Sequence, residues 1–133
     1  MNKKTAMIVE DDKETRDMLS AFLCKKNFSV IEAENGKEAL AKIKAQLPDL
    51  IISDIIMPEM DGFKLLKFIK SGRQTKNIPT IMLTSKKEAE SLDKGISLGA
   101  DFYLPKPFSF DNLSQFIELI FGQETLDSGK SVC

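Results

Sequence analysis

Five short apolar runs divide the chain, and each predicts a buried β-strand. The runs are Ala6–Val9, Phe28–Ile31, Leu50–Ile52, Ile81–Leu83 and, more weakly, Phe102–Leu104. Such nearly continuous runs are typical of strands that are covered on both faces, because a strand with one face in water alternates apolar and polar residues.

Between these runs, apolar residues recur at the spacing that places them on one face of an α-helix. The stripes are Met18/Phe22 with Leu19/Leu23, Leu40/Ile43/Leu47, Leu66/Ile69, Ala89/Leu92/Ile96 and Leu113/Phe116/Ile117/Ile120. Asp111 can cap the last helix near its start, and Gly99 can supply a left-handed position that ends the preceding helix. Five β-α units with short connections predict an α/β fold, a doubly wound (βα)5 flavodoxin-like parallel sheet in the strand order 2-1-3-4-5.

Polar residues follow the predicted strands at their carboxyl ends. Glu10 and Asp11 follow the first strand, Asp54 the third, Thr84 the fourth and Lys106 the fifth. Each residue alone has an ordinary interpretation, such as a helix cap or a solvated acid at a helix N-terminus. In an open α/β sheet, however, ligands bind beyond the carboxyl ends of the strands. Together these residues predict one site, where three carboxylates attract a hard divalent cation such as Mg²⁺.

Four sequence motifs at these strand ends resemble those of receiver domains in two-component response regulators. They are IVEDD from Ile8, SDIIMPEMDG from Ser53, MLTS from Met82 and LGADFYLPKPF from Leu98. The resemblance extends over nearly the whole chain, so we expect a receiver domain in residues 1–122 and a polar tail or linker in residues 123–133.

The resemblance implies that Asp54 is the phosphoacceptor. It also implies that Glu10, Asp11 and Asp54 hold Mg²⁺ together with the main-chain carbonyl of Ile56.

Thr84 and Lys106 are implied to contact the phosphoryl group. Tyr103 falls at the position of an aromatic residue that moves with Thr84 as a switch, and the Lys106–Pro107 peptide bond is implied to be cis.

The implied function is a phosphorylation-dependent signalling switch, which is not a turnover enzyme and catalyses only its own phosphorylation and dephosphorylation. The donor would be a phosphohistidine on a sensor histidine kinase or a histidine phosphotransfer protein. The chain would be a stand-alone receiver or the N-terminal part of a larger regulator. An effector or a second copy of the chain could bind the face formed by the fourth helix, the fifth strand and the last helix, to which Phe102 contributes.

Two other functions fit the sequence less well. A phosphorylation-independent binding module of the same fold is the main alternative, but its signature would be loss of Asp54, Lys106 or an acidic residue, and none is lost. An aspartyl-phosphate hydrolase would place a second aspartate two residues after the nucleophile, where this chain has Ile56.

Composition and charge exclude several other classes. Nineteen basic and twenty acidic residues give a net charge of -1, so we expect no direct nucleic-acid binding. No apolar run approaches the ~20 residues of a membrane span, and the N-terminal run is too short for a secretion signal, so we expect no membrane contact. Two cysteines without framework spacing, and no histidine, favour a reducing, cytoplasmic setting over a disulfide framework or a zinc site.

Overall fold

A computed structural model describes residues 3–55, 62–85 and 99–122. The described strands are β1 (Lys4–Val9), β2 (Phe28–Ala33), β3 (Leu50–Asp54), β4 (Thr80–Thr84) and β5 (Phe102–Pro105). The described helices are α1 (Lys13–Lys25), α2 (Gly36–Ala45), α3 (Gly62–Ser71) and α5 (Phe110–Phe121). The helix predicted around Ala89, Leu92 and Ile96 lies outside the described residues.

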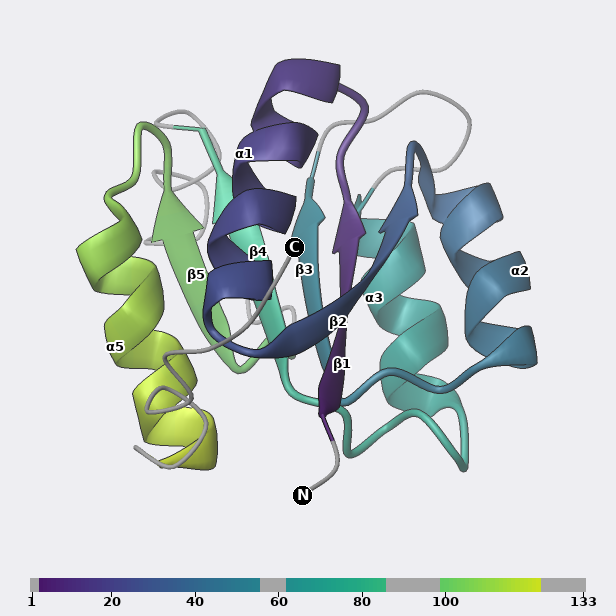
Figure 1. The fold of residues 1–133 in the computed structure, drawn as a ribbon. Coiled ribbons are helices and arrows are strands. Elements are labelled where there is room, and N and C mark those ends of the chain that lie inside the picture. Colours follow the sequence, from purple (N-terminus) through teal and green to yellow (C-terminus); the bar gives the residue numbers. More distant parts are fainter. Residues whose placement is uncertain (1–2, 56–61, 86–98, 123–133) are drawn as a thin grey trace.

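The strands form one parallel sheet in the order β2-β1-β3-β4-β5, which confirms the predicted topology (Figure 1). β1 lies between β2 and β3, with Val9 paired to Ala33 on one side and to Ser53 on the other. The strand order therefore reverses at the carboxyl end of β1, which is where such sheets bind ligands.

Alternate side chains of the strands enter two separate apolar layers, because successive residues of a strand point to opposite faces. One layer joins Ala6 and Ile8 to Leu19 and Leu23 of α1 and to Leu113 and Ile117 of α5. The other joins Met7 and Val9 to Ala39 and Ile43 of α2 and to Leu65 and Ile69 of α3. Figure 1 shows α1 and α5 on one face of the sheet and α2 and α3 on the other. Burial on both faces explains the continuous apolar runs in the sequence.

Side-chain caps determine where α1 and α5 begin. The Asp12 carboxylate accepts a hydrogen bond from the Thr15 amide at 3.1 Å at the start of α1. At the start of α5, Ser109 Oγ accepts from the Asn112 amide at 3.1 Å. The prediction that Asp111 caps α5 was therefore wrong, because Asp111 lies inside the first helical turn.

The prediction for Gly99 was confirmed, whereas the prediction for Leu47 was wrong. Gly99 has a φ of 86°, the left-handed conformation that was predicted for it. Leu47 lies beyond the end of α2 and is 46% exposed, so its assignment to the apolar stripe of that helix was wrong. No helix in the described parts of the chain is long and apolar enough to cross a bilayer.

Candidate functional site

The candidate site lies at the carboxyl ends of four neighbouring strands. Glu10 and Asp11 directly follow β1, Asp54 is the last residue of β3, and Thr84 is the last residue of β4. Lys106 directly follows β5. Pairing of Asp54 with Leu83, and of Thr84 with Pro105, brings these strand ends to the same level. The sheet thus gathers residues that are far apart in the sequence.

Lys106 connects two of the three acids. Its Nζ atom donates hydrogen bonds to Glu10 Oε1 and to Asp54 Oδ2, each at 3.1 Å. Glu10 is 1% exposed and Asp54 is 9% exposed, so both carboxylates are largely removed from water. The lysine compensates part of their charge, which is what buried acids require. The Lys106–Pro107 peptide bond is cis.

Asp54 is buried, but it is not an isolated charge within the strand. It ends β3, and its Oδ1 accepts a hydrogen bond from the Ile55 amide at 2.8 Å while Oδ2 faces Lys106. The apolar residues before it are buried in the two core layers. The aspartate therefore lies where the apolar strand meets a charged rim.

Burial raises the pKa of the Glu10 carboxyl to about 7. The negative charge of Asp54 acts in the same direction, whereas hydrogen bonds from the Asp12 amide and from Lys106 oppose the increase. Burial also lowers the pKa of Lys106, but hydrogen bonds and charges from Asp54 and Glu10 outweigh it, so that pKa is raised. In the described parts of the chain, Lys106 is therefore the lysine that partly balances the carboxylates of Glu10 and Asp54.

Three carboxylates at this rim are suited to a divalent cation. One oxygen from each of Glu10, Asp11 and Asp54 lies within 4.8 Å of the others. Mg²⁺ prefers oxygen ligands and commonly takes one or two carboxylates together with water and phosphate oxygens. A dication would also counter the repulsion from Asp54, which adds to the effect of burial on the pKa of Glu10. The predicted fourth ligand, the carbonyl of Ile56, lies outside the described residues.

Thr84 carries a buried hydroxyl that has no hydrogen-bond partner among the residues that the structure describes. The residue is 0% exposed, and its Oγ1 makes no hydrogen bond with any group in the described parts of the chain. Leaving a buried polar group unpaired costs about 1–3 kcal/mol, so such groups are rare and call for an explanation. A hydroxyl at the end of β4, one strand away from Asp54, is suited to a ligand that binds at the rim.

Tyr103 lies at the edge of a small apolar cluster formed by Ile55, Leu66 and Met82. It is half-buried, and its hydroxyl accepts a hydrogen bond from the Ala100 amide at 3.3 Å. Tyr103 is in β5 and Thr84 is in the neighbouring strand β4. The switch between these two residues stays a prediction.

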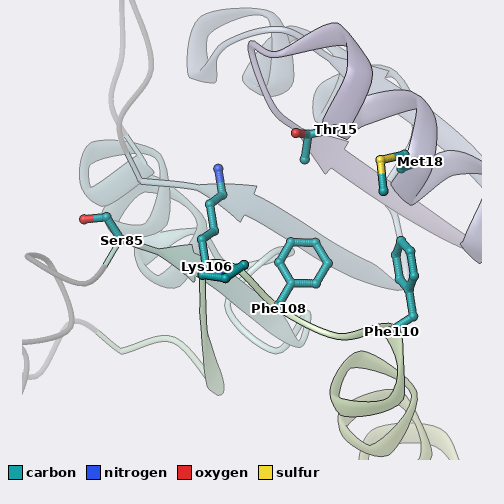
Figure 2. Close-up of a pocket in the computed structure, with 7 residues that line it drawn as sticks. Thr15, Met18, Ser85, Lys106, Phe108 and Phe110 are labelled. Atoms are coloured by element: carbon teal, nitrogen blue, oxygen red, sulfur yellow. The ribbon is translucent and has the colours of Figure 1, made fainter.

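An apolar hollow adjoins the lysine. Figure 2 shows Thr15 and Met18 of α1 on one side, with Lys106, Phe108 and Phe110 facing them. The hollow has a volume of about 450 Å³, and Ser85 and Pro107 complete its lining. It gives the charged rim an apolar neighbour that reaches the molecular surface, since Met18 is 52% exposed.

Two residues at this rim make backbone contacts that the sequence analysis did not identify. Gly62, at the start of α3, approaches the backbone so closely that a Cβ there would overlap the Asp54 carbonyl oxygen and lie 2.7 Å from Ile55 Cα. Arg16 is 7% exposed and lies on the buried face of α1 with Leu19 and Leu23. A charged residue three positions before Leu19, on the apolar stripe, was the available signal for Arg16.

The chain belongs to the response regulator receiver domain family, which it matches over residues 6–118. Domains of this family serve in two-component signalling, where phosphorylation controls the response regulator. This membership confirms the family resemblance found in the sequence motifs.

Two curated relatives illustrate the match. The chain is 40% identical over 106 residues to the phosphate regulon transcriptional regulatory protein PhoB of Pseudomonas aeruginosa, covering 80% of this chain and 46% of that protein. It is 45% identical over 107 residues to histidine kinase P4 of Formosa agariphila, covering 80% of this chain and 8% of that protein. The chain thus spans less than half the length of either relative.

Solved structures show the same fold. The chemotaxis response regulator CheY4 of Vibrio cholerae superposes with a TM-score of 0.81 at 33% identity, covering 90% of this chain and 100% of that one. The receiver domain of the Francisella response regulator 1452 gives a TM-score of 0.79 at 30% identity, covering 91% of this chain and 98% of that one.

Proposed function

We propose that Asp54 accepts a phosphoryl group from a phosphohistidine on a sensor histidine kinase or a histidine phosphotransfer protein. The observation that carries this proposal is the contact of Lys106 with both Asp54 and Glu10, each at 3.1 Å. A lysine between two buried acids stabilises an aspartate at the rim and can also receive the oxygens of an incoming phosphoryl group. Phosphoryl transfer requires such positioning and charge stabilisation more than covalent work by the protein.

Transfer would form a bond between an Asp54 carboxylate oxygen and phosphorus and break the bond from phosphorus to the donor nitrogen. The bonding electron pair leaves with the imidazole, and its uptake of a proton restores the neutral donor. Lys106 would stabilise negative charge on the phosphoryl oxygens, and Thr84 Oγ1 would donate a hydrogen bond to one of them. Glu10, Asp11 and Asp54 would hold Mg²⁺, which supplies positive charge for the same oxygens.

The unpaired hydroxyl of Thr84 supports a phosphorylation-dependent change of shape. A hydrogen bond that exists only with the phosphoryl group present favours one conformation over the other by its differential free energy. We propose that Thr84 moves toward phosphorylated Asp54 and that Tyr103 moves with it, which alters the surface around β5. The chain would catalyse its own phosphorylation and dephosphorylation rather than turn over a separate substrate.

Residues 1–122 would form the receiver domain, and residues 123–133 a tail or linker. The surface of β5 and α5 would bind an effector or a second copy of the chain, because Phe102 and Phe116 stack there at a centroid distance of 4.6 Å and Leu119 is 72% exposed. The hollow between α1 and Phe108 lies next to Lys106 and would contact the protein that donates the phosphoryl group.

Intact mass after incubation with Mg²⁺ and acetyl phosphate tests the proposal. We expect wild type to gain one phosphoryl group in a reaction that needs Mg²⁺, and Asp54→Asn to gain none. Asp17→Asn is the matched control, because Asp17 is an exposed acid on α1 that pairs only with Lys13 in the described residues. Wild type that stays unmodified by acetyl phosphate and by phosphorylated donor proteins would favour the phosphorylation-independent binding module.

A further inference from the structure

Glu10 is fixed at its amide, its carbonyl and both side-chain oxygens. Its amide donates to the Ala33 carbonyl at 3.0 Å, and Lys106 binds Oε1 at 3.1 Å. Its Oε2 accepts from the Asp12 amide at 3.2 Å, and its main-chain carbonyl accepts from Arg16 Nη1 at 2.8 Å. The contact from Arg16 is a side-chain contact that neither the metal-binding nor the phosphoryl-binding role explains.

Arg16 reaches back from α1 to the loop that carries the acids. Its Nη1 also lies 3.5 Å from the Asp11 carbonyl, so the same nitrogen faces both peptide groups. Side chains on a helix tilt toward its N-terminus, and Arg16 stands only three residues after the first residue of α1. The arginine is therefore positioned to hold the main chain of Glu10 and Asp11 from within the protein.

The opposite edge of the guanidinium faces the end of β2. Nε lies 3.4 Å from Glu32 Oε1, and Nη2 lies 3.5 Å from Glu34 Oε1. These ion pairs are long, and the side chains of Glu32 and Glu34 are 42% and 65% exposed, so solvent weakens both interactions. Within the described parts of the chain, the buried contact with the Glu10 carbonyl is the shortest polar contact of Arg16.

We propose that Arg16 is the positioning residue of the acidic loop: by holding the carbonyls of Glu10 and Asp11, it directs both carboxylates toward Asp54 and sets the Mg²⁺ affinity of the site. This inference rests on the proposed function only for the identity of the metal. Acids that repel one another need such support, because the loop would otherwise relax and let the carboxylates separate. A planar guanidinium with several fixed donors supplies this support better than an ammonium group.

Mg²⁺ titration by calorimetry, without a phosphodonor, tests the proposal on wild type, Arg16→Lys, Arg16→Met and Glu34→Gln. We expect the dissociation constant to rise at least about tenfold in Arg16→Met, the size of effect that partners of metal ligands commonly have. Arg16→Lys keeps the positive charge but not the fork of donors, so its Mg²⁺ affinity should lie between those of wild type and Arg16→Met. Glu34→Gln removes an outward contact of Arg16 and should bind Mg²⁺ as wild type does.

Amide hydrogen exchange without Mg²⁺ separates positioning from a general loss of stability. In Arg16→Lys the Asp12 amide, which donates to Glu10 Oε2, should lose protection while amides in the middle of β1 and β3 keep theirs. Equal loss of protection everywhere would overturn the proposal, as would wild-type Mg²⁺ affinity in Arg16→Met or full restoration by lysine. If Arg16→Met does not fold, the Mg²⁺ titration and the hydrogen exchange of Arg16→Lys together test the proposal.

The outcomes also separate this inference from the proposed function. Wild type that binds Mg²⁺ but never gains a phosphoryl group would refute phosphorylation of Asp54 and leave the role of Arg16 intact. Normal phosphorylation with Mg²⁺ affinity insensitive to Arg16 would refute the role of Arg16 alone.

Discussion

Replacing Thr84 by valine should stabilise the protein while it impairs phosphorylation. Thr84 is 0% exposed and its hydroxyl has no partner in the described residues, so the native protein carries the cost of burying that group. Valine has nearly the same shape and no polar atom. We expect the free energy of unfolding to rise by about 1 kcal/mol, the lower end of the cost of an unpaired buried group. For a domain of this size the melting temperature would rise by roughly 4 °C.

Thr80 provides the matched control on the same strand. It is also 0% exposed, but its hydroxyl lies 3.4 Å from Asp101 Oδ2 and accepts from the Asp101 amide at 3.3 Å. Thr80→Val should therefore lower the free energy of unfolding by about 1 kcal/mol, because the hydrogen bonds between the Thr80 hydroxyl and Asp101 are lost. Replacing threonine by valine on β4 should therefore raise the free energy of unfolding at position 84 and lower it at position 80.

Urea unfolding at pH 7 without Mg²⁺, followed by far-ultraviolet circular dichroism, measures both changes, since the chain has no tryptophan. Phosphorylation by acetyl phosphate, followed by intact mass, should slow about tenfold in Thr84→Val, equivalent to losing about 1.4 kcal/mol of transition-state stabilisation. Thr80→Val should react like wild type. A Thr84→Val protein destabilised as much as Thr80→Val would show that the hydroxyl is paired in solution and would refute the reasoning.

Four further predictions concern the rest of the rim. Mg²⁺ binding requires the deprotonated form of Glu10, whose pKa is raised to about 7, so affinity should rise about tenfold from pH 6 to pH 8. Without Mg²⁺ the same raised pKa makes Glu10 favour folding less as pH rises from about 4.5 to about 7. Calorimetric titration should show the rise in Mg²⁺ affinity, and urea unfolding should show the fall in stability. Glu10→Gln should remove the contribution of Glu10 to both pH profiles. Profiles that do not change in Glu10→Gln would show that another group titrates. Gly62→Ala should lower the free energy of unfolding by about 2–3 kcal/mol, because its Cβ would collide with the main chain of β3, whereas Gly72→Ala meets mainly the Thr75 side chain; equal urea midpoints for the two variants would count against this. Met18→Glu should slow phosphorylation by a histidine phosphotransfer protein but not by acetyl phosphate; equal slowing with both donors would show that the hollow does not contact the donor protein.

The sheet was predictable because its core obeys a strong local rule. Residues such as Met7 and Ile8 are both buried although they face opposite layers, and a short continuous apolar run is typical of a strand covered on both faces. The start of α5 was harder to predict, because Ser109 and Asp111 both suit a helix cap, and the choice between them depends on backbone geometry that the sequence does not encode locally.

The acids and the lysine of the site could be located from the sequence because parallel strands bring their carboxyl ends to one edge. The roles of Arg16 and Gly62 could not, since they depend on contacts with main-chain atoms of other segments. The unpaired state of Thr84 is likewise a property of the packed structure. Side-chain type indicates which chemistry is present, whereas the support of that chemistry by the backbone appears only in three dimensions.

The hydrogen bond between Lys106 and Glu10 has a consequence for synthesis of the protein. It joins residues that are 96 positions apart, and the bond from Lys106 to Asp54 spans 52 positions. A growing chain that has left the ribosome only as far as β4 contains all three acids but lacks Lys106, which pairs with Glu10 and Asp54. The site is completed only when the last strand joins the edge of the sheet, and parallel pairing of distant strands is a slow step in folding. A fragment that ends before β5 therefore lacks the lysine that pairs with Glu10 and Asp54 in the folded protein.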